Sequence, residues 1–198
     1  MLKAEITTFQ AVSSSEEQII SLLVTDRKKA IRLIYDHYGD TLYGVVCTMT
    51  GDEEAAKDIL QESLLKVWQR ALDYDKDKAR LFTWLLRITR NAAIDRMRAD
   101  GRRQDHMIQK QLEDVYKVER PINPDHLDIA QHVSQLDERY GKVIHALFFL
   151  GLTQEEASKA LDLPLGTIKS RLRIGLRELR KVYGDPLILW IILTLWNK

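Results

Sequence analysis

Cysteine and proline are scarce in this sequence. Its 198 residues include one cysteine, Cys47, and 4 prolines. A single cysteine cannot form a disulfide within the chain, so we expect a buried thiol and no oxidising compartment. The N-terminal residues also lack the basic-then-apolar pattern of a secretory signal. We therefore expect a cytoplasmic protein.

The sequence has neither a marked excess of charge nor a long apolar stretch. Its 30 basic and 29 acidic residues leave a formal net charge of +1, so any nucleic-acid binding must come from local basic patches rather than a uniformly basic coat. Two such patches occupy residues 87–103 and 169–181. The apolar run over residues 187–196 is well short of the roughly 20 residues that span a bilayer as a helix. We therefore expect no membrane span.

The apolar residues of the sequence are spaced mainly with the period of an α-helix. Apolar residues recur at helical spacing in most segments, and no strand-like alternation competes with them. We expect Gly39-Asp40 to turn the chain between two helical runs. Gly51-Asp52 marks the next break, where Asp52 is a natural N-cap followed by two acids at the positive end of the helix dipole. The sequence predicts an all-α protein.

A change in composition divides the chain into two small helical domains joined by a flexible linker. The linker is polar and acidic, contains Pro121 and Pro124, and has few apolar positions to bury. The expected parts are a flexible N-terminus (1–15), a first helical domain (16–98), the linker (99–128), a second helical domain (129–184) and an apolar tail (185–198).

The second domain contains the signature of a helix-turn-helix. Thr153 and Glu156 form a capping box, which places a helix start near Gln154. Pro164 follows the end of that helix and can open the next one. In the second helix one stripe at helical spacing is expected to be buried, made of Ile168, Leu172, Leu176 and Leu179.

The other face of this second helix favours DNA binding. The major groove, about 12 Å wide, admits one helix, and Arg, Lys and Ser side chains bond base edges or phosphates. For an isolated helix, the simpler interpretation is an ordinary amphipathic helix whose basic face is only solvated. Here the capped partner helix and the tight turn favour a helix that binds in the major groove. The expected contacts are Thr167, Lys169, Ser170, Arg171, Arg173 and Arg177.

The first domain presents two further polar surfaces. The helix after Asp52 has a core stripe (Ala56, Ile59, Leu60, Ser63, Leu64, Val67 and Trp68) and, across from it, the residues Asp58, Gln61 and Glu62. This polar face suits a partner rich in Arg and Lys, although such faces are usually only solvated. A polar loop over residues 73–80 leads into the next helix.

That next helix combines a core stripe with a candidate single-strand platform. Leu81, Trp84, Leu85, Ile88, Ala92 and Met97 are expected in the core. An exposed side is expected to carry Arg87, Arg90, Asn91 and Arg98. Cations that hold phosphates beside an amide and an aromatic side chain can bind unstacked bases, although Trp84 is expected in the core rather than as a base wedge.

Taken together, these segments resemble a known family. The runs Asp58-Ile-Leu-Gln-Glu62, Phe82-Thr-Trp-Leu-Leu-Arg-Ile-Thr-Arg-Asn-Ala-Ala-Ile-Asp95, Leu152-Thr-Gln-Glu-Glu-Ala-Ser and Gly166-Thr-Ile-Lys-Ser-Arg-Leu172 resemble bacterial sigma factors of the extracytoplasmic-function group. Both domains match in the right order, over roughly residues 20–182. The resemblance implies a factor that carries core RNA polymerase to promoters and helps to open them, and it makes an anti-sigma partner expected.

The resemblance also implies a role for each surface. The face of Asp58, Gln61 and Glu62 would dock on the polymerase, and the linker would thread toward the RNA exit path. The loop and the helix after it would capture a flipped minus-10 base, with contacts from Tyr74, Lys76, Lys78, Arg80, Arg87, Arg90 and Asn91. The helix after Pro164 would read the minus-35 element. The tail has no counterpart in the pattern; it would pack on the DNA-binding domain or a partner, or pin the domains together until polymerase or DNA displaces it.

Two other functions compete with this interpretation. A helix-turn-helix repressor would need dimer symmetry and no polymerase-binding face. A metal-dependent hydrolase could use Asp58 and Glu62, one helical turn apart, to share a divalent ion, but no third ligand is placed to complete such a site. We therefore expect no enzyme activity, no metal, no cofactor and no small-molecule substrate.

Overall fold

Helices account for all the regular secondary structure in residues 16–100 and 133–183, the ranges that the computed structural model describes. The first range holds a helix over residues 16–25, α2 (Arg27–Thr50), α3 (Glu53–Gln69), the short 3-10 helix η1 (Ala71–Asp73) and α4 (Leu81–Ala99). The second range contains α7 (Glu138–Ile144), the π-helical turn η2 (His145–Phe149), α8 (Gln154–Ala160) and α9 (Leu165–Tyr183).

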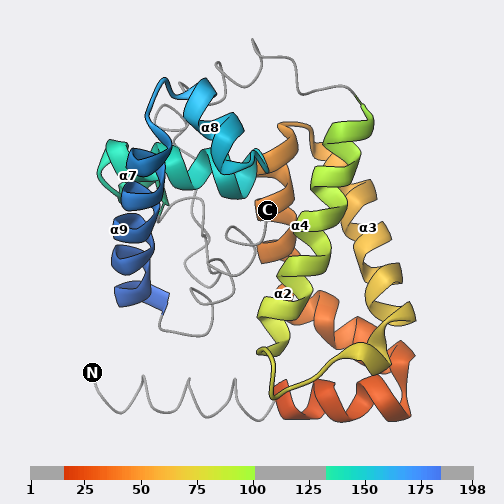
Figure 1. Cartoon of the computed structure of the whole chain (residues 1–198). Coiled ribbons are helices and arrows are strands. Elements are labelled where there is room, and N and C mark those ends of the chain that lie inside the picture. The colour runs from red at the N-terminus through yellow and green to blue at the C-terminus, as the bar shows by residue number, and fades with distance from the viewer. Residues whose placement is uncertain (1–15, 101–132, 184–198) are drawn as a thin grey trace.

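In the first range, α2, α3 and α4 pack on one another around a shared apolar core (Figure 1). The break between α2 and α3 is confirmed at the predicted residues. Gly51 ends α2 in the left-handed conformation, with φ of 67°, which glycine adopts without a Cβ clash. Asp52 then caps α3 by accepting hydrogen bonds from the backbone N–H of Glu54 at 3.0 Å and of Ala55 at 3.1 Å.

The turn predicted at Gly39-Asp40 is wrong, because α2 runs through both residues without interruption. Gly39 is buried, and a Cβ at this position would lie 3.2 Å from the ring of Tyr35. The glycine therefore makes room for the aromatic side chain one turn earlier in the helix. A single glycine inside a helix costs only about 1 kcal/mol relative to alanine, which the packing of a 24-residue helix overcomes.

Most of the predicted core stripes are confirmed. In α4, all six expected core residues are buried, and Trp84 is only 4% exposed. In α3, the stripe is right except at its last position, where Trp68 is 41% exposed. Leu65 and Leu72, the neighbouring apolar residues in the sequence, are exposed as well, so apolar side chains of this segment also face solvent.

The predicted helix-turn-helix is also confirmed. Thr153 and Glu156 make both bonds of the capping box, at 3.1 Å and 2.7 Å, and α8 begins at Gln154 as expected. The carbonyl of Pro164 accepts from the N–H of Thr167 and Ile168, so this proline opens α9. The predicted stripe of α9 is buried at every position.

The two groups of helices meet where η2 contacts α2 and reaches Arg90 of α4 (Figure 1). Phe148 and Phe149 of η2 are fully buried and meet edge to face, with ring centroids 5.0 Å apart. The predicted linker, apart from its first two residues, and the predicted N-terminus and tail lie outside the described residues. None of the helices in the described ranges is long and apolar enough to cross a membrane.

Burial of His145 makes stability depend on pH. Desolvation lowers the pKa of His145 to about 4, below its ordinary value of 6.5, because charging a buried imidazole is unfavourable. The unfolded chain therefore takes up a proton at higher pH than the folded one. We expect the free energy of unfolding to fall as pH drops from about 6.5 to about 4, by up to about 3 kcal/mol.

This dependence can be measured by urea unfolding at a series of pH values. The variant His145→Leu should flatten the curve over this window. His37→Leu, at an exposed position of α2, should leave it unchanged. An unaltered slope in His145→Leu would contradict the assignment.

Candidate nucleic-acid interface

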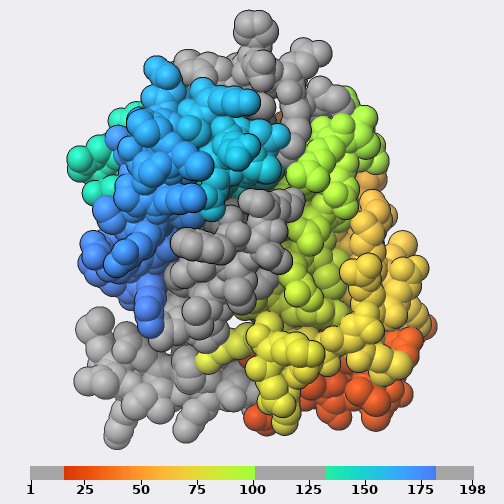
Figure 2. Space-filling view, viewed as in Figure 1, coloured from red at the N-terminus to blue at the C-terminus, as the bar shows by residue number. Residues whose placement is uncertain are grey.

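The basic face of α9 points away from its own domain. Lys169, Ser170 and Arg173 are exposed, and Arg171 is half-buried, on the side opposite the buried stripe. The Ser170 hydroxyl donates to the carbonyl of Thr167 at 3.0 Å. Within the described ranges, no acid lies at ion-pair distance from Lys169 or Arg173. In the view of Figure 2, α9 lies at the edge of the molecule away from α3.

Local bonds set the angle between α8 and α9. After α8 ends, Asp162 takes a left-handed conformation with φ of 50°, which Asp tolerates better than most residues. The Ser158 hydroxyl donates to the carbonyl of Leu163 at 2.5 Å and so ties α8 to the turn. The turn therefore fixes the position of the first residues of α9 relative to α8.

Of the other predicted contacts, Thr167 is half-buried, and Arg177 is exposed with its Nε 3.7 Å from Glu178.

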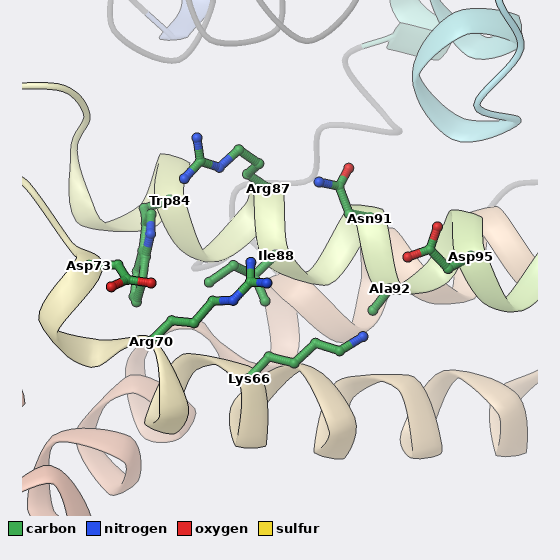
Figure 3. A pocket seen from close by; sticks show the side chains of 9 residues that line it. All are labelled: Lys66, Arg70, Asp73, Trp84, Arg87, Ile88, Asn91, Ala92 and Asp95. Carbon is green, nitrogen blue, oxygen red and sulfur yellow. The ribbon is translucent and has the colours of Figure 1, made fainter.

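A cavity of about 400 Å³ opens between α3 and α4 (Figure 3). Lys66 of α3 and Arg70, the residue that caps its C-terminus, extend toward α4, and Arg87 of α4 also lines the cavity. The amide of Asn91 lies on the same wall. The remaining lining residues are Asp73, Trp84, Ile88, Ala92 and Asp95. The cavity thus combines positive charge with an aromatic wall and a few hydrogen-bonding groups.

The loop before α4 borders this cavity and is held by Tyr74. The Tyr74 hydroxyl donates to the carbonyl of Ala79 at 3.1 Å, and its ring centroid lies 5.3 Å from that of Trp84. Burial, followed by the nearby Glu16 and Asp75 carboxylates, raises the pKa of Tyr74 to about 12, so its hydroxyl stays protonated.

The cations of this loop differ in their surroundings. Lys78 is exposed but pairs with Asp75 at 3.0 Å. Lys76 and Arg80 are exposed to solvent. None of these three lines the cavity. The first N–H of α4, that of Leu81, donates to the Glu16 carboxylate at 2.9 Å, so the helix over residues 16–25 also positions α4.

The structure brings Arg87 and Asn91 together but separates Arg90 from them. The expectation that Arg90 lies on the exposed side is wrong, because it is 3% exposed and faces η2. Periodicity within α4 carries no information about a helix more than 50 residues further along the chain. Arg98 is exposed as expected.

Two cations of the cavity were missed in the sequence. These are Lys66 and Arg70, neither of which is among the predicted contacts. They lie four residues apart on one side of α3, next to the predicted loop, and this spacing was the available signal. Lys66 also pairs with Glu62 at 2.8 Å.

The polar face of α3 is solvent-exposed at all three predicted positions, Asp58, Gln61 and Glu62. Leu65, 63% exposed, extends this face with an apolar side chain. No three His, Cys, Asp or Glu residues in the described parts of the chain gather in a way that could hold a metal ion.

Comparison with known proteins identifies the family. Residues 34–103 match the family described as sigma-70 region 2, and residues 133–181 match sigma-70 region 4. The chain belongs to the sigma-70 family, whose members are regulatory DNA-binding proteins. It is an alternative sigma factor of the extracytoplasmic-function group, which binds core RNA polymerase and promoter DNA and initiates transcription by promoter recognition.

The relatives support this group. The chain is 29% identical to the ECF RNA polymerase sigma factor SigK of Mycobacterium ulcerans over 82% of its own length and 90% of the relative. It is 28% identical to the ECF RNA polymerase sigma factor RpoE of Cereibacter sphaeroides, over 75% of the chain and 83% of the relative.

Two solved structures are also similar. One is CnrH in complex with the cytosolic domain of CnrY, with 20% identity, a TM-score of 0.42, and coverage of 85% of this chain and 99% of that one. The other is RpoE in complex with the anti-sigma factor NepR from Bartonella quintana, with 23% identity, a TM-score of 0.38, and coverage of 80% and 97%.

The capping box provides a test of how α9 is supported. Thr153→Ala removes the acceptor for the Glu156 N–H, so we expect the second domain to lose about 1 kcal/mol of stability and binding to duplex promoter DNA to weaken. Thr153→Ser keeps the hydroxyl and should restore both. Thermal unfolding and fluorescence anisotropy measure the two effects; an unchanged melting temperature for Thr153→Ala would contradict this role.

Proposed function

We propose that three surfaces of the chain divide promoter recognition among them. The face of α9 reads the minus-35 element as duplex, the cavity between α3 and α4 holds an unpaired minus-10 base, and the face of Asp58, Gln61 and Glu62 docks on core polymerase. The observation that carries this proposal is the cavity, because a gap lined by cations, an amide and an aromatic wall suits a single nucleotide rather than a duplex.

The proposed minus-35 contacts follow from exposure and charge. Lys169 and Arg173 lie on the outward face of α9 with no competing acid in the described ranges, so they are available to phosphates and guanine edges. Thr167 and Ser170 lie in the first turns, and hydroxyls bond either bases or backbone. Arg171, half-buried, and Arg177, exposed, complete the proposed contacts.

The proposed minus-10 site places each group of the cavity against part of a nucleotide. Arg70, Arg87 and Lys66 offer charge to phosphates on either side of the base. The Asn91 amide can both donate to and accept from a base edge, and Asp73 can accept from an exocyclic amine. Unstacking a base costs a few kcal/mol, and these contacts would offset that cost.

The loop contributes to the same proposal from outside the cavity. Lys76 and Arg80 are exposed beside it and can follow the displaced strand, as can Lys78 once released from Asp75. Tyr74 holds the loop in place through its bond to Ala79. Arg90 would join these contacts only after leaving its buried position.

Further partners are part of the proposal. Both similar structures are complexes, one of them with an anti-sigma factor; we expect this chain to have such a partner. It would act in the bacterial cytoplasm, where polymerase and promoters meet. It would itself catalyse no reaction, since the polymerase forms the phosphodiester bonds.

The alternative function, a helix-turn-helix repressor, requires no polymerase. Run-off transcription with core enzyme therefore separates a sigma factor from a repressor.

The division between DNA and polymerase surfaces can be tested with a pair of variants. Arg171→Ala should weaken promoter binding by about 10- to 100-fold, the range for losing one base or phosphate contact, and leave polymerase affinity intact. Glu62→Lys should do the reverse, because it puts a positive charge where an Arg or Lys of the partner is expected. Each serves as control for the other in anisotropy with promoter DNA and with core polymerase. Equal loss of both activities in either variant would contradict the division.

The cavity can be tested through promoter opening. Asn91→Ala and Arg70→Ala should reduce permanganate reactivity of minus-10 thymines by about 10-fold or more. On a template whose minus-10 strands are already unpaired, the defect of both variants should be smaller, because the duplex no longer has to be opened. Arg96→Ala, at an exposed position of α4 paired with Asp100, is the matched control and should open promoters normally. If Asn91→Ala and Arg70→Ala open promoters as efficiently as the control, the cavity does not hold the base.

A further inference from the structure

Arg90 joins the two promoter-reading domains through a buried contact. Its Nε donates to the carbonyl of Phe148 at 2.8 Å, and one terminal nitrogen donates to the carbonyl of Leu147 at 2.8 Å. The guanidinium carbon also lies 5.0 Å from the centroid of the Phe148 ring, within the range of a cation–π contact. Arg90 belongs to region 2, whereas Leu147 and Phe148 belong to region 4.

These two carbonyls belong to the last turn of the helix formed by α7 and η2. The carbonyls at the end of a helix have no partner within it, and here the main chain satisfies two of them. The His145 carbonyl accepts from Leu150 N–H, and the Ala146 carbonyl accepts from Leu152 N–H, each at 3.1 Å. The next two accept from Arg90. Region 2 therefore supplies part of the C-terminal cap of a region 4 helix, where the helix dipole favours a cation.

The buried charge of Arg90 depends on the two carbonyls of η2. Burial, with a smaller contribution from the charge of Arg98, lowers the pKa of Arg90 to about 10. In the described ranges no carboxylate lies at ion-pair distance from the guanidinium. A buried charge that loses its hydrogen-bond acceptors is strongly destabilised, so the closed arrangement holds only while the carbonyls of η2 stay in place.

A closed molecule is too small to bind both promoter elements. A compact chain of 198 residues has a radius of gyration of about 16 Å, or a diameter of about 42 Å for a sphere. The minus-35 and minus-10 elements lie about 25 base pairs apart, or about 80 Å along B-form DNA at 34 Å for each turn of about 10 base pairs. The two domains must therefore separate before both elements are read.

We propose that Arg90 is an intramolecular latch, which holds regions 2 and 4 together in the free factor and is released when the factor is loaded on polymerase and promoter. Arg90 lies between Arg87 and Asn91 in the sequence of α4, although its side chain faces η2 in the closed state; in the released state its cation becomes available to the minus-10 strand. Capping of η2 and contact with DNA are then mutually exclusive. This last step rests on the proposed function of the cavity; the latch itself does not.

The ratio of open to closed molecules can be measured by single-molecule fluorescence energy transfer in the full chain, without polymerase or DNA. Dyes are placed by Lys57→Cys on α3 and Lys159→Cys on α8, both exposed, with Cys47→Ala as background. Arg90→Met keeps the length and apolar contact but removes the donors. We expect the ratio of open to closed molecules to rise about 100-fold, the factor for two charge-assisted hydrogen bonds. Arg90→Lys, which cannot bond both carbonyls in the same fork geometry, should give an intermediate rise.

Two controls make the outcome decisive. Arg96→Met removes an exposed arginine from the same helix and should leave the ratio unchanged. Far-UV circular dichroism separates opening from unfolding, and if Arg90→Met loses helix content, Arg90→Lys decides the result. An open fraction in folded Arg90→Met or Arg90→Lys equal to that of Arg96→Met overturns the latch. Because no promoter is present, this result is independent of whether the cavity binds a minus-10 base.

Discussion

The charged guanidinium of Arg90, removed from water, joins the two groups of helices. Arg90 is compatible with its buried position only because two main-chain carbonyls from a distant helix accept its protons. The contact therefore links two elements with opposite requirements: α4 must expose its cations to bind nucleic acid, whereas the end of η2 needs a donor. One side chain satisfies the second requirement at the expense of the first.

The remaining functional surfaces are organised around the same helix. One side of α4 packs on α2 and α3, another contacts η2 through Arg90, and Arg87 and Asn91 line the cavity. Helix α3 likewise serves two surfaces, with Glu62 on the proposed polymerase face and Lys66 in the cavity, joined by an ion pair of 2.8 Å. Exposed pairs of this kind are weak, so a partner that takes Glu62 can free Lys66 at little cost.

Local signals in the sequence predicted a large part of the fold and of the helix-turn-helix. Caps at Asp52 and Thr153 depend on residues three or fewer positions away, and buried stripes depend on spacing within one helix, so both can be inferred without neighbours. The prediction failed at Gly39, where a glycine makes room for Tyr35 rather than a turn. It failed again at Trp68, because spacing alone does not show where the neighbouring helices end.

By itself, the sequence determined the helices, their caps, the basic face of α9, the polar face of α3 and the family to which they point, since each depends on residues close together in the chain. Only the tertiary structure decided that Lys66 and Arg70 share a cavity with Arg87 and Asn91, and that Arg90 is buried against η2. These facts depend on which helices meet in space. For Arg90 the meeting joins segments more than 50 residues apart, and for the cavity it joins two different helices; periodicity within one helix encodes neither.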